Sequence, residues 1–135
     1  MKWELKSELY YAKTHEWVKA EGGNSVVVGI TDYAQDKLGD VVFVELPEEG
    51  QEVEKGENIA VIESVKAVVD FYAPVKGKVT SLNREVEEKP ELLNESPYAE
   101  GWIFKMEAED PQQLKELMDE EQYREHLVKE EEEEN

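Results

Sequence analysis

The sequence predicts a single, mainly β domain: a sandwich or flattened barrel with a short inserted helix and further helices near the C-terminal end. Short runs rich in β-branched and aromatic residues recur about every eight to twelve residues, as in antiparallel sandwiches and barrels. Turns that contain glycine or proline separate these runs, and helical periodicity is confined to a few segments. The length of 135 residues suits one domain with a core of its own.

The first predicted elements are a hairpin followed by a short helix. Residues 16–21 alternate in character, and the Gly-Gly-Asn sequence at 22–24 supplies a turn into a second strand at 25–30. Thr31 can cap a helix that Gly39 ends. The predicted buried face of this helix consists of Tyr33, Ala34 and Leu38.

Four more runs predict strands in the middle of the chain. They cover residues 41–46, 58–62, 68–74 and 78–82. Val53 lies between two glycine turns that precede the second of these runs. The connection between the second and third runs is short, so it lifts Lys66 clear of the sheet on a flexible stem.

In the C-terminal third, the regular succession of short strands gives way to a loop, one strand and helices. Residues 83–101 predict a loop with one helical turn near 91–93, and residues 102–106 predict the last strand. A helix is predicted to start at Asp110, with Pro111 in its first turn and Gln113 reaching back to the cap. Leu114, Leu117 and Met118 would dock that helix, and a last helix at about 121–128 would bury Tyr123 and Leu127.

Composition excludes several classes of function. The formal net charge of −19 repels phosphate backbones and anionic membranes, which argues against nucleic-acid and membrane binding. The absence of cysteine excludes disulfides and thiol catalysis. No run reaches bilayer length and no secretion signal opens the chain, so the sequence predicts a cytoplasmic protein. We expect residues 1–128 to form the domain and residues 129–135 to be an acidic, disordered tail.

The motif with the most specific chemistry is Glu63-Ser64-Val65-Lys66-Ala67. An amine on a rigid hairpin tip suits enzymatic acylation, because another enzyme must enclose it. Taken alone, the five residues fit an ordinary solvated lysine better. Ser64 has no base partner in the pattern, which argues against a serine nucleophile.

Ordered blocks along the chain resemble the H-protein family of the glycine cleavage system, from about Tyr10 to Tyr123. The blocks are Tyr11-Ala12-Lys13-Thr14-His15-Glu16-Trp17-Val18, Gly29-Ile30-Thr31-Asp32-Tyr33-Ala34-Gln35, residues 38–47, residues 63–67, Tyr72-Ala73-Pro74, residues 90–94, Ser96-Pro97-Tyr98 and Gly101-Trp102. The resemblance implies a barrel-sandwich hybrid of the lipoyl/biotinyl-domain type. It also implies that (R)-lipoate is attached covalently to Lys66.

The function that the resemblance implies is that of a carrier and not of an enzyme. Lipoyl-Lys66 would receive an aminomethyl group from the pyridoxal-phosphate glycine decarboxylase (P protein). It would pass the group to the tetrahydrofolate-dependent aminomethyltransferase (T protein), and dihydrolipoamide dehydrogenase (L protein) would reoxidise the arm. A lipoate ligase or a lipoyl/octanoyl transferase would load Lys66. The chemistry would belong to the cofactors and partner enzymes.

The resemblance also assigns residues to a cleft that shelters the arm, namely Thr14, Glu16 and Asp70. From the residues alone, both acids could equally be solvated. Glu63, Ser64, Val65 and Ala67 would present Lys66 to the loading enzyme. His15 is expected to be structural, and His126 is given no role.

Four other functions compete with this one. A biotin carrier typically has methionine on both sides of the lysine, where this chain has Val65 and Ala67. A lipoyl domain of a 2-oxoacid dehydrogenase usually has Asp before the lysine and a Pro/Ala-rich linker, and neither is present. An H-like carrier that relays lipoate to other enzymes stays open, as does a structural interaction module whose lysine is never acylated. No metal cluster or catalytic dyad is apparent in the sequence.

Overall fold

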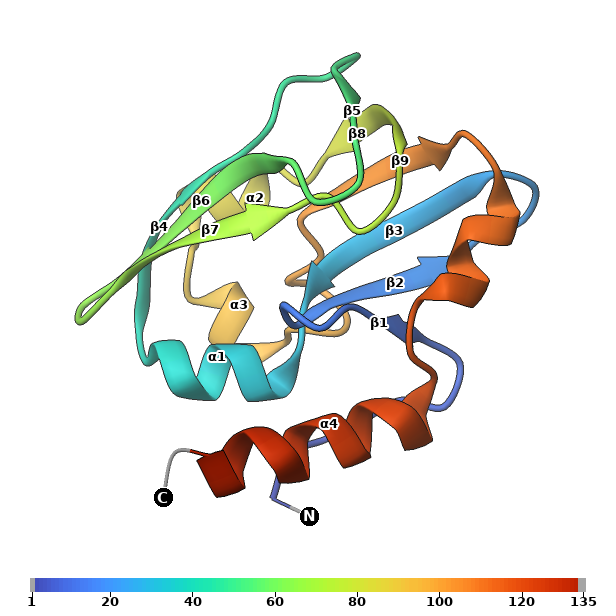
Figure 1. Cartoon of the computed structure of the whole chain (residues 1–135). Coiled ribbons are helices and arrows are strands. Elements are labelled where there is room, and N and C mark those ends of the chain that lie inside the picture. The colour runs from blue at the N-terminus through green and yellow to red at the C-terminus, as the bar shows by residue number, and fades with distance from the viewer. Residues whose placement is uncertain (1, 134–135) are drawn as a thin grey trace.

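Two antiparallel sheets face each other in the computed structural model, which describes residues 2–133 (Figure 1). The larger sheet has six strands in the order β1-β2-β3-β9-β8-β5, and the smaller one has the order β4-β6-β7. The strands of the larger sheet are β1 (Tyr10–Tyr11), β2 (Glu16–Ala20), β3 (Ser25–Ile30), β9 (Phe104–Ala108), β8 (Gly77–Leu82) and β5 (Glu52–Val53). Those of the smaller sheet are β4 (Val41–Glu45), β6 (Asn58–Ser64) and β7 (Val68–Tyr72). The mainly β class that the sequence predicts is therefore confirmed.

Alternation along β2 and β3 divides the apolar residues between two cores. Val18, Val26 and Val28 face the main core, where both sheets contribute buried side chains such as Phe71 and Phe104. Their neighbours on the opposite face belong to a second cluster, which consists of Leu9, Tyr11, Trp17, Val27, Tyr33, Tyr123 and Leu127. The second cluster fixes the C-terminal helix and the N-terminal segment to the outer face of the larger sheet.

The inserted helix α1 (Asp32–Leu38) begins and ends as predicted. The Thr31 hydroxyl accepts a hydrogen bond from the Ala34 amide at 3.2 Å, and Gly39 follows the last turn with a φ of +77°. Tyr33 and Leu38 are buried, and Ala34 is partly buried against the main core. Two short helices, α2 (Glu85–Glu88) and α3 (Leu92–Glu95), occupy the segment that was predicted to be a loop with one helical turn.

The predictions for the last strand and for the helix after it were wrong in three respects. The last strand is β9 at Phe104–Ala108 and not at 102–106, because its register is set by pairing with β3 and β8. The helix after Asp110 is the 3₁₀ helix η1 (Pro111–Glu116). Asp110 caps it by accepting from the Gln112 amide at 2.9 Å, but the Gln113 side chain accepts from the Lys76 amide at 2.8 Å instead of reaching back to the cap.

The C-terminal helix α4 (Glu120–Glu133) is longer than predicted. Tyr123 and Leu127 are buried in the second cluster, as expected. The helix continues through residues 129–133, so the expectation of a disordered tail was wrong for those residues, and residues 134–135 lie outside the described part of the chain. The physical reason is that Glu130 and Glu131 accept hydrogen bonds from the body of the protein. Within residues 2–133, no helix has the length and apolar character that crossing a membrane requires.

Candidate functional site

The loop from Val65 to Ala67 joins β6 to β7 and forms the hairpin tip (Figure 1). At its base, the Ser64 amide donates to the Ala67 carbonyl at 2.8 Å. The Ser64 hydroxyl oxygen accepts from the amides of Ala67 at 3.1 Å and Lys66 at 3.3 Å. The Val65 amide donates to the Asp40 carbonyl at 3.0 Å, just before β4. These bonds give the tip a defined shape, and Ser64 serves as its internal support.

Lys66 lies at the tip with its side chain exposed. Its stem passes over Gly39, where an added Cβ would lie 3.4 Å from Lys66 Cε. The positive φ of Gly39 favours glycine at this helix end, and the absence of a side chain leaves room for the lysine stem. The structure therefore presents a primary amine on an ordered and accessible loop, and acylation of this amine stays a prediction.

An apolar strip flanks Glu63 on the exposed face of the smaller sheet. Phe43 pairs with Glu63, and Glu63 pairs with Val68, so the three side chains share one face. Phe43 is 50% exposed, Val68 is 64% exposed and Val65 at the tip is 71% exposed. Because large apolar side chains clustered on a surface mark contact sites, this strip is a candidate surface for recognition of the tip.

Two hollows lie between the sheets' edges and share Thr14 and Glu16. The first has a volume of about 280 Å³, and Ala67 and Val69 line it close to the tip, because they follow Lys66 along the chain. Its remaining apolar wall includes Ile30, Leu38, Ile62 and Phe71. The second hollow, of about 550 Å³, extends from Glu16 past Tyr72 and Pro74 to Met118. Glu16 therefore lies where the first hollow, which begins near the tip, meets the second and larger hollow.

Glu16 is the buried acid of this region, with only 2% of its surface exposed. Burial raises the pKa of its carboxyl to about 7, although the Thr14 hydroxyl and backbone hydrogen bonding from Tyr72 favour the charged form and act against this rise. The Thr14 hydroxyl donates to Glu16 Oε1. A carboxyl with this pKa is close to half ionised at neutral pH, so it can hold a proton or accept a hydrogen bond from a cation.

Asp70 lines the same hollow as Thr14 and Glu16, so the structure brings together the three residues that the resemblance assigned to a cleft. Asp70 is exposed on β7, whereas Glu16 is buried at the start of β2. The other predicted residues divide between two places. Ala67 lines the hollow, and Glu63 and Val65 lie outside its lining on the exposed side of the hairpin.

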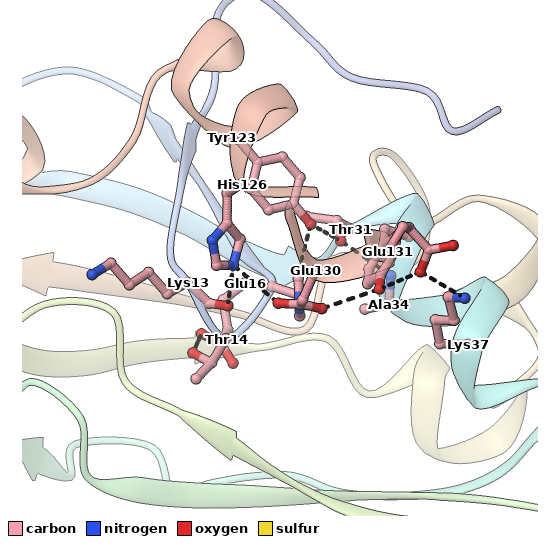
Figure 2. A network of polar contacts seen from close by, with 12 residues as sticks. Lys13, Thr14, Glu16, Thr31, Ala34, Lys37, Tyr123, His126, Glu130 and Glu131 are labelled. Atoms are coloured by element: carbon pink, nitrogen blue, oxygen red, sulfur yellow. Dashed lines mark hydrogen bonds and ion pairs between the residues drawn. The ribbon is translucent and has the colours of Figure 1, made fainter. Parts of the chain in front are cut away.

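A polar network beside the first hollow was missed by the sequence reasoning (Figure 2). His15 Nδ1 lies 2.8 Å from the Tyr123 hydroxyl, which also lies 2.8 Å from the Thr31 hydroxyl. His15 Nε2 lies 3.0 Å from both carboxylate oxygens of Glu130, and His126 Nε2 lies 3.0 Å from Glu130 Oε1. His15 is therefore a bonded link between the start of β2 and α4.

One signal in the sequence could have pointed to this network. His126 and Glu130 are four residues apart, which places them on one face of a helix. Nothing near them in the sequence indicates His15, because the contact spans 115 residues. Glu130 also opens an unbroken acidic run, a pattern typical of a solvated tail, so the sequence gives no sign that it contacts the body of the protein.

Comparisons with known proteins agree with one another. The model of a family described as Glycine cleavage H-protein matches residues 9–131. A glycine cleavage system H protein from Thermus thermophilus is 54% identical over 127 residues, which cover 94% of this chain and 98% of the relative. One from Staphylococcus saprophyticus is 56% identical over 121 residues, covering 90% and 95%. The crystal structure of a glycine cleavage system H protein from Mycobacterium marinum is similar with a TM-score of 0.80 and 32% identity, covering 88% of this chain and 95% of that one. This similarity confirms the predicted barrel-sandwich hybrid fold.

Proposed function

The chain belongs to the glycine cleavage H-protein family, and from this premise we propose that it is the lipoyl carrier of a glycine cleavage system, with (R)-lipoate joined to Lys66 through an amide. The observation that carries the proposal is an exposed lysine at a supported hairpin tip, beside a hollow that leads to a buried acid. The carrier would accept the aminomethyl group from the P protein and deliver it to the T protein.

The residues around Lys66 fit this cofactor. The lysine amine is exposed for amide formation, and Ala67, Val69 and Phe71 offer an apolar wall to a hydrocarbon chain. When bound, lipoate supplies a disulfide that takes up the one-carbon group and is restored by reoxidation. The chain itself would contribute attachment, orientation and exclusion of water, and would not be catalytic.

Glu16 is proposed to hold the amino end of the cargo. A cationic amine next to a buried carboxyl favours the ionised form, and the charged pair would be strong because little water reaches it. The Thr14 hydroxyl already donates to Glu16 Oε1, which orients the carboxylate. Asp70, on the exposed side of the same hollow, would supply a second negative charge.

The apolar strip formed by Phe43, Val65 and Val68 is proposed to guide loading. A lipoate ligase or a lipoyl/octanoyl transferase must enclose Lys66, and this strip surrounds Glu63 on the accessible face of the tip. Glu63 and Ser64 would then present the lysine, the first by contact with the enzyme and the second by supporting the loop. The P, T and L proteins would meet the same tip in turn.

Exchange of a single lysine tests the proposal. The wild-type chain and the variants Lys66→Arg and Lys78→Arg are incubated with a lipoate ligase, ATP and lipoate, and their intact masses are measured. We expect one lipoyl group on the wild type and on Lys78→Arg, and none on Lys66→Arg, because a guanidinium does not form the amide. Lys78 lies on β8 and is exposed, so its variant controls for loss of an ordinary surface lysine.

The loaded proteins are then reconstituted with P, T and L proteins, and glycine-dependent NADH formation is followed. Activity with the wild type and none with Lys66→Arg would support the carrier function. A lipoyl group on Lys66→Arg, or glycine-dependent activity without Lys66, would overturn it. Loading without glycine-dependent activity would instead support the role of lipoate relay.

A further inference from the structure

The polar network on α4 contains a set of ligands that none of the proposed carrier chemistry uses. Two imidazole nitrogens, His15 Nε2 and His126 Nε2, both point at the carboxylate of Glu130. The three ligand atoms lie within 4.8 Å of one another. From this geometry we propose that His15, His126 and Glu130 form a binding site for a divalent transition-metal ion of the zinc type, which fastens α4 to the body of the protein.

The spacing of the ligand atoms suits such an ion. Each imidazole nitrogen lies 3.0 Å from Glu130 Oε1. In a tetrahedral zinc site with bonds of about 2.1 Å, neighbouring ligand atoms are about 3.4 Å apart, so adjustments of the side chains, with no change of the fold, bring the three ligand atoms to that spacing. Two imidazoles with one carboxylate are a donor set that zinc accepts with its fourth position open.

The ligands come from rigid and separate parts of the fold. His126 and Glu130 share one face of α4, four residues apart. His15 precedes β2 and has a φ of +75°, a conformation that side-chain-bearing residues seldom adopt. Such a backbone persists only where its surroundings hold it, and here it aims the imidazole at α4. The ion would therefore link two segments that are far apart in the sequence.

A second layer of partners already orients the ligands. The Tyr123 hydroxyl, 2.8 Å from His15 Nδ1, can accept a hydrogen bond from Nδ1–H, and in that tautomer the lone pair of Nε2 is free for a metal. The Tyr33 hydroxyl donates to Glu130 Oε2 at 3.0 Å, which leaves Oε1 facing the two imidazoles. Supporting contacts of this kind are typical of metal sites.

The surroundings also allow an ion to enter and to bind. The Glu130 side chain is 31% exposed and that of His126 is 24% exposed, so the site opens to solvent. The Lys13 carbonyl oxygen lies 3.2 Å from His126 Nε2, so polar atoms and not apolar ones adjoin this ligand (Figure 2). When the ion binds, each imidazole coordinates through the lone pair of Nε2 and carries its single ring proton on Nδ1.

Zinc titration of the full chain tests the site. Zn²⁺ is titrated in competition with a coloured chelator, and excess Mg²⁺ is present to occupy the many surface carboxylates. We expect one equivalent to bind to the wild type, and Glu130→Gln and His126→Gln to bind at least about ten-fold more weakly. Glu125→Gln is the matched control, since it removes an exposed carboxylate from the same helix and should bind zinc as the wild type does. Circular dichroism without zinc establishes that each variant is folded.

A measurement on the wild type alone keeps the test independent of folding of the variants. The chain has only two histidines, so their ring-proton NMR signals are readily followed. One equivalent of Zn²⁺ should shift the signals of both. Binding that the Glu130 and His126 variants retain in full, or histidine signals that stay unchanged while zinc binds, would overturn the proposal. The test needs no lipoate and no glycine cleavage activity, so its outcome is separate from that of the carrier function.

Discussion

The hairpin tip and the α4 network place functional groups by opposite means. At the tip, the supporting hydrogen bonds of Ser64 join residues at most three positions apart in the sequence. In the network, His15 reaches Tyr123 across 108 residues and Glu130 across 115. Apart from the bond of the Val65 amide to the Asp40 carbonyl, the tip is held by local contacts. The comparison teaches that a site meant for display can be built mostly locally, whereas a site that fastens one segment to another depends on the whole fold.

The two regions also differ in what their residues do for stability. The tip residues Val65, Lys66 and Val68 are exposed and contribute little buried surface. Tyr123 in the network is fully buried, and its ring stacks on Tyr11 with 4.4 Å between centroids. Substitutions should therefore affect stability strongly at the network and mainly affect recognition at the tip.

The largest expected effect is that of Tyr123→Ala. Removing this ring leaves a cavity in the second cluster and takes the hydrogen-bond partner from His15 and Thr31. We expect a loss of about 3–5 kcal/mol in the free energy of unfolding, measured by urea denaturation. Val65→Ala at the tip should change the same quantity by no more than about 0.5 kcal/mol. Equal losses for the two variants would contradict the division between the regions.

The same division explains how much of the fold the sequence could predict. The hairpin around Lys66 and helix α1 were predicted because their turn and capping residues are neighbours in the chain. The last strand was misplaced by two residues because β3 and β8 determine its register. Gln113 was assigned to a cap because its alternative partner, the Lys76 amide, is distant in the sequence.

The candidate site follows the same pattern. Lys66 was identified from its immediate neighbours, and Thr14, Glu16 and Asp70 were identified by family resemblance. That Glu16 is buried could not be predicted, since its sequence neighbours fit an exposed acid equally well. Its burial follows from the packing of segments around it, among them the one that contains Tyr72 and Ala73. The role of Glu130 was missed because acidic tails are usually solvated.

The second prediction concerns Glu16, which lines the hollow that has the hairpin tip at one end and the α4 network beside it. Burial raises its pKa from 4.5 to about 7, so the folded protein binds a proton more tightly than the unfolded chain does. Stability from this group is complete below pH 4.5 and is lost as the pH rises to about 7, by about 3 kcal/mol in total. Glu16→Gln should lack this loss, so its stability relative to the wild type should improve over that range. Urea denaturation between pH 4 and pH 8 measures the difference.

Thr14→Val provides the matched test of the cause. The Thr14 hydroxyl stabilises the ionised carboxyl, so its removal should raise the pKa of Glu16 further. In Thr14→Val, the loss of stability with rising pH should therefore extend to higher pH and be larger than it is in the wild type. If Glu16→Gln and the wild type changed in parallel with pH, Glu16 would have to be solvated, and the hollow would not provide the dry environment that the proposed cargo site needs.

The smallest effect on stability is expected at the tip, for Ser64→Ala. The variant removes the hydroxyl that accepts hydrogen bonds from the Lys66 and Ala67 amides, at a cost of about 1 kcal/mol in the free energy of unfolding. Lipoylation of Lys66, followed by intact mass, should nevertheless slow clearly, because the loading enzyme would meet a loop without its internal support. Ser81→Ala on β8 is the matched control and should be loaded at the wild-type rate. Unchanged loading of Ser64→Ala would mean that exposure of Lys66 suffices for recognition and that the shape of the tip does not matter.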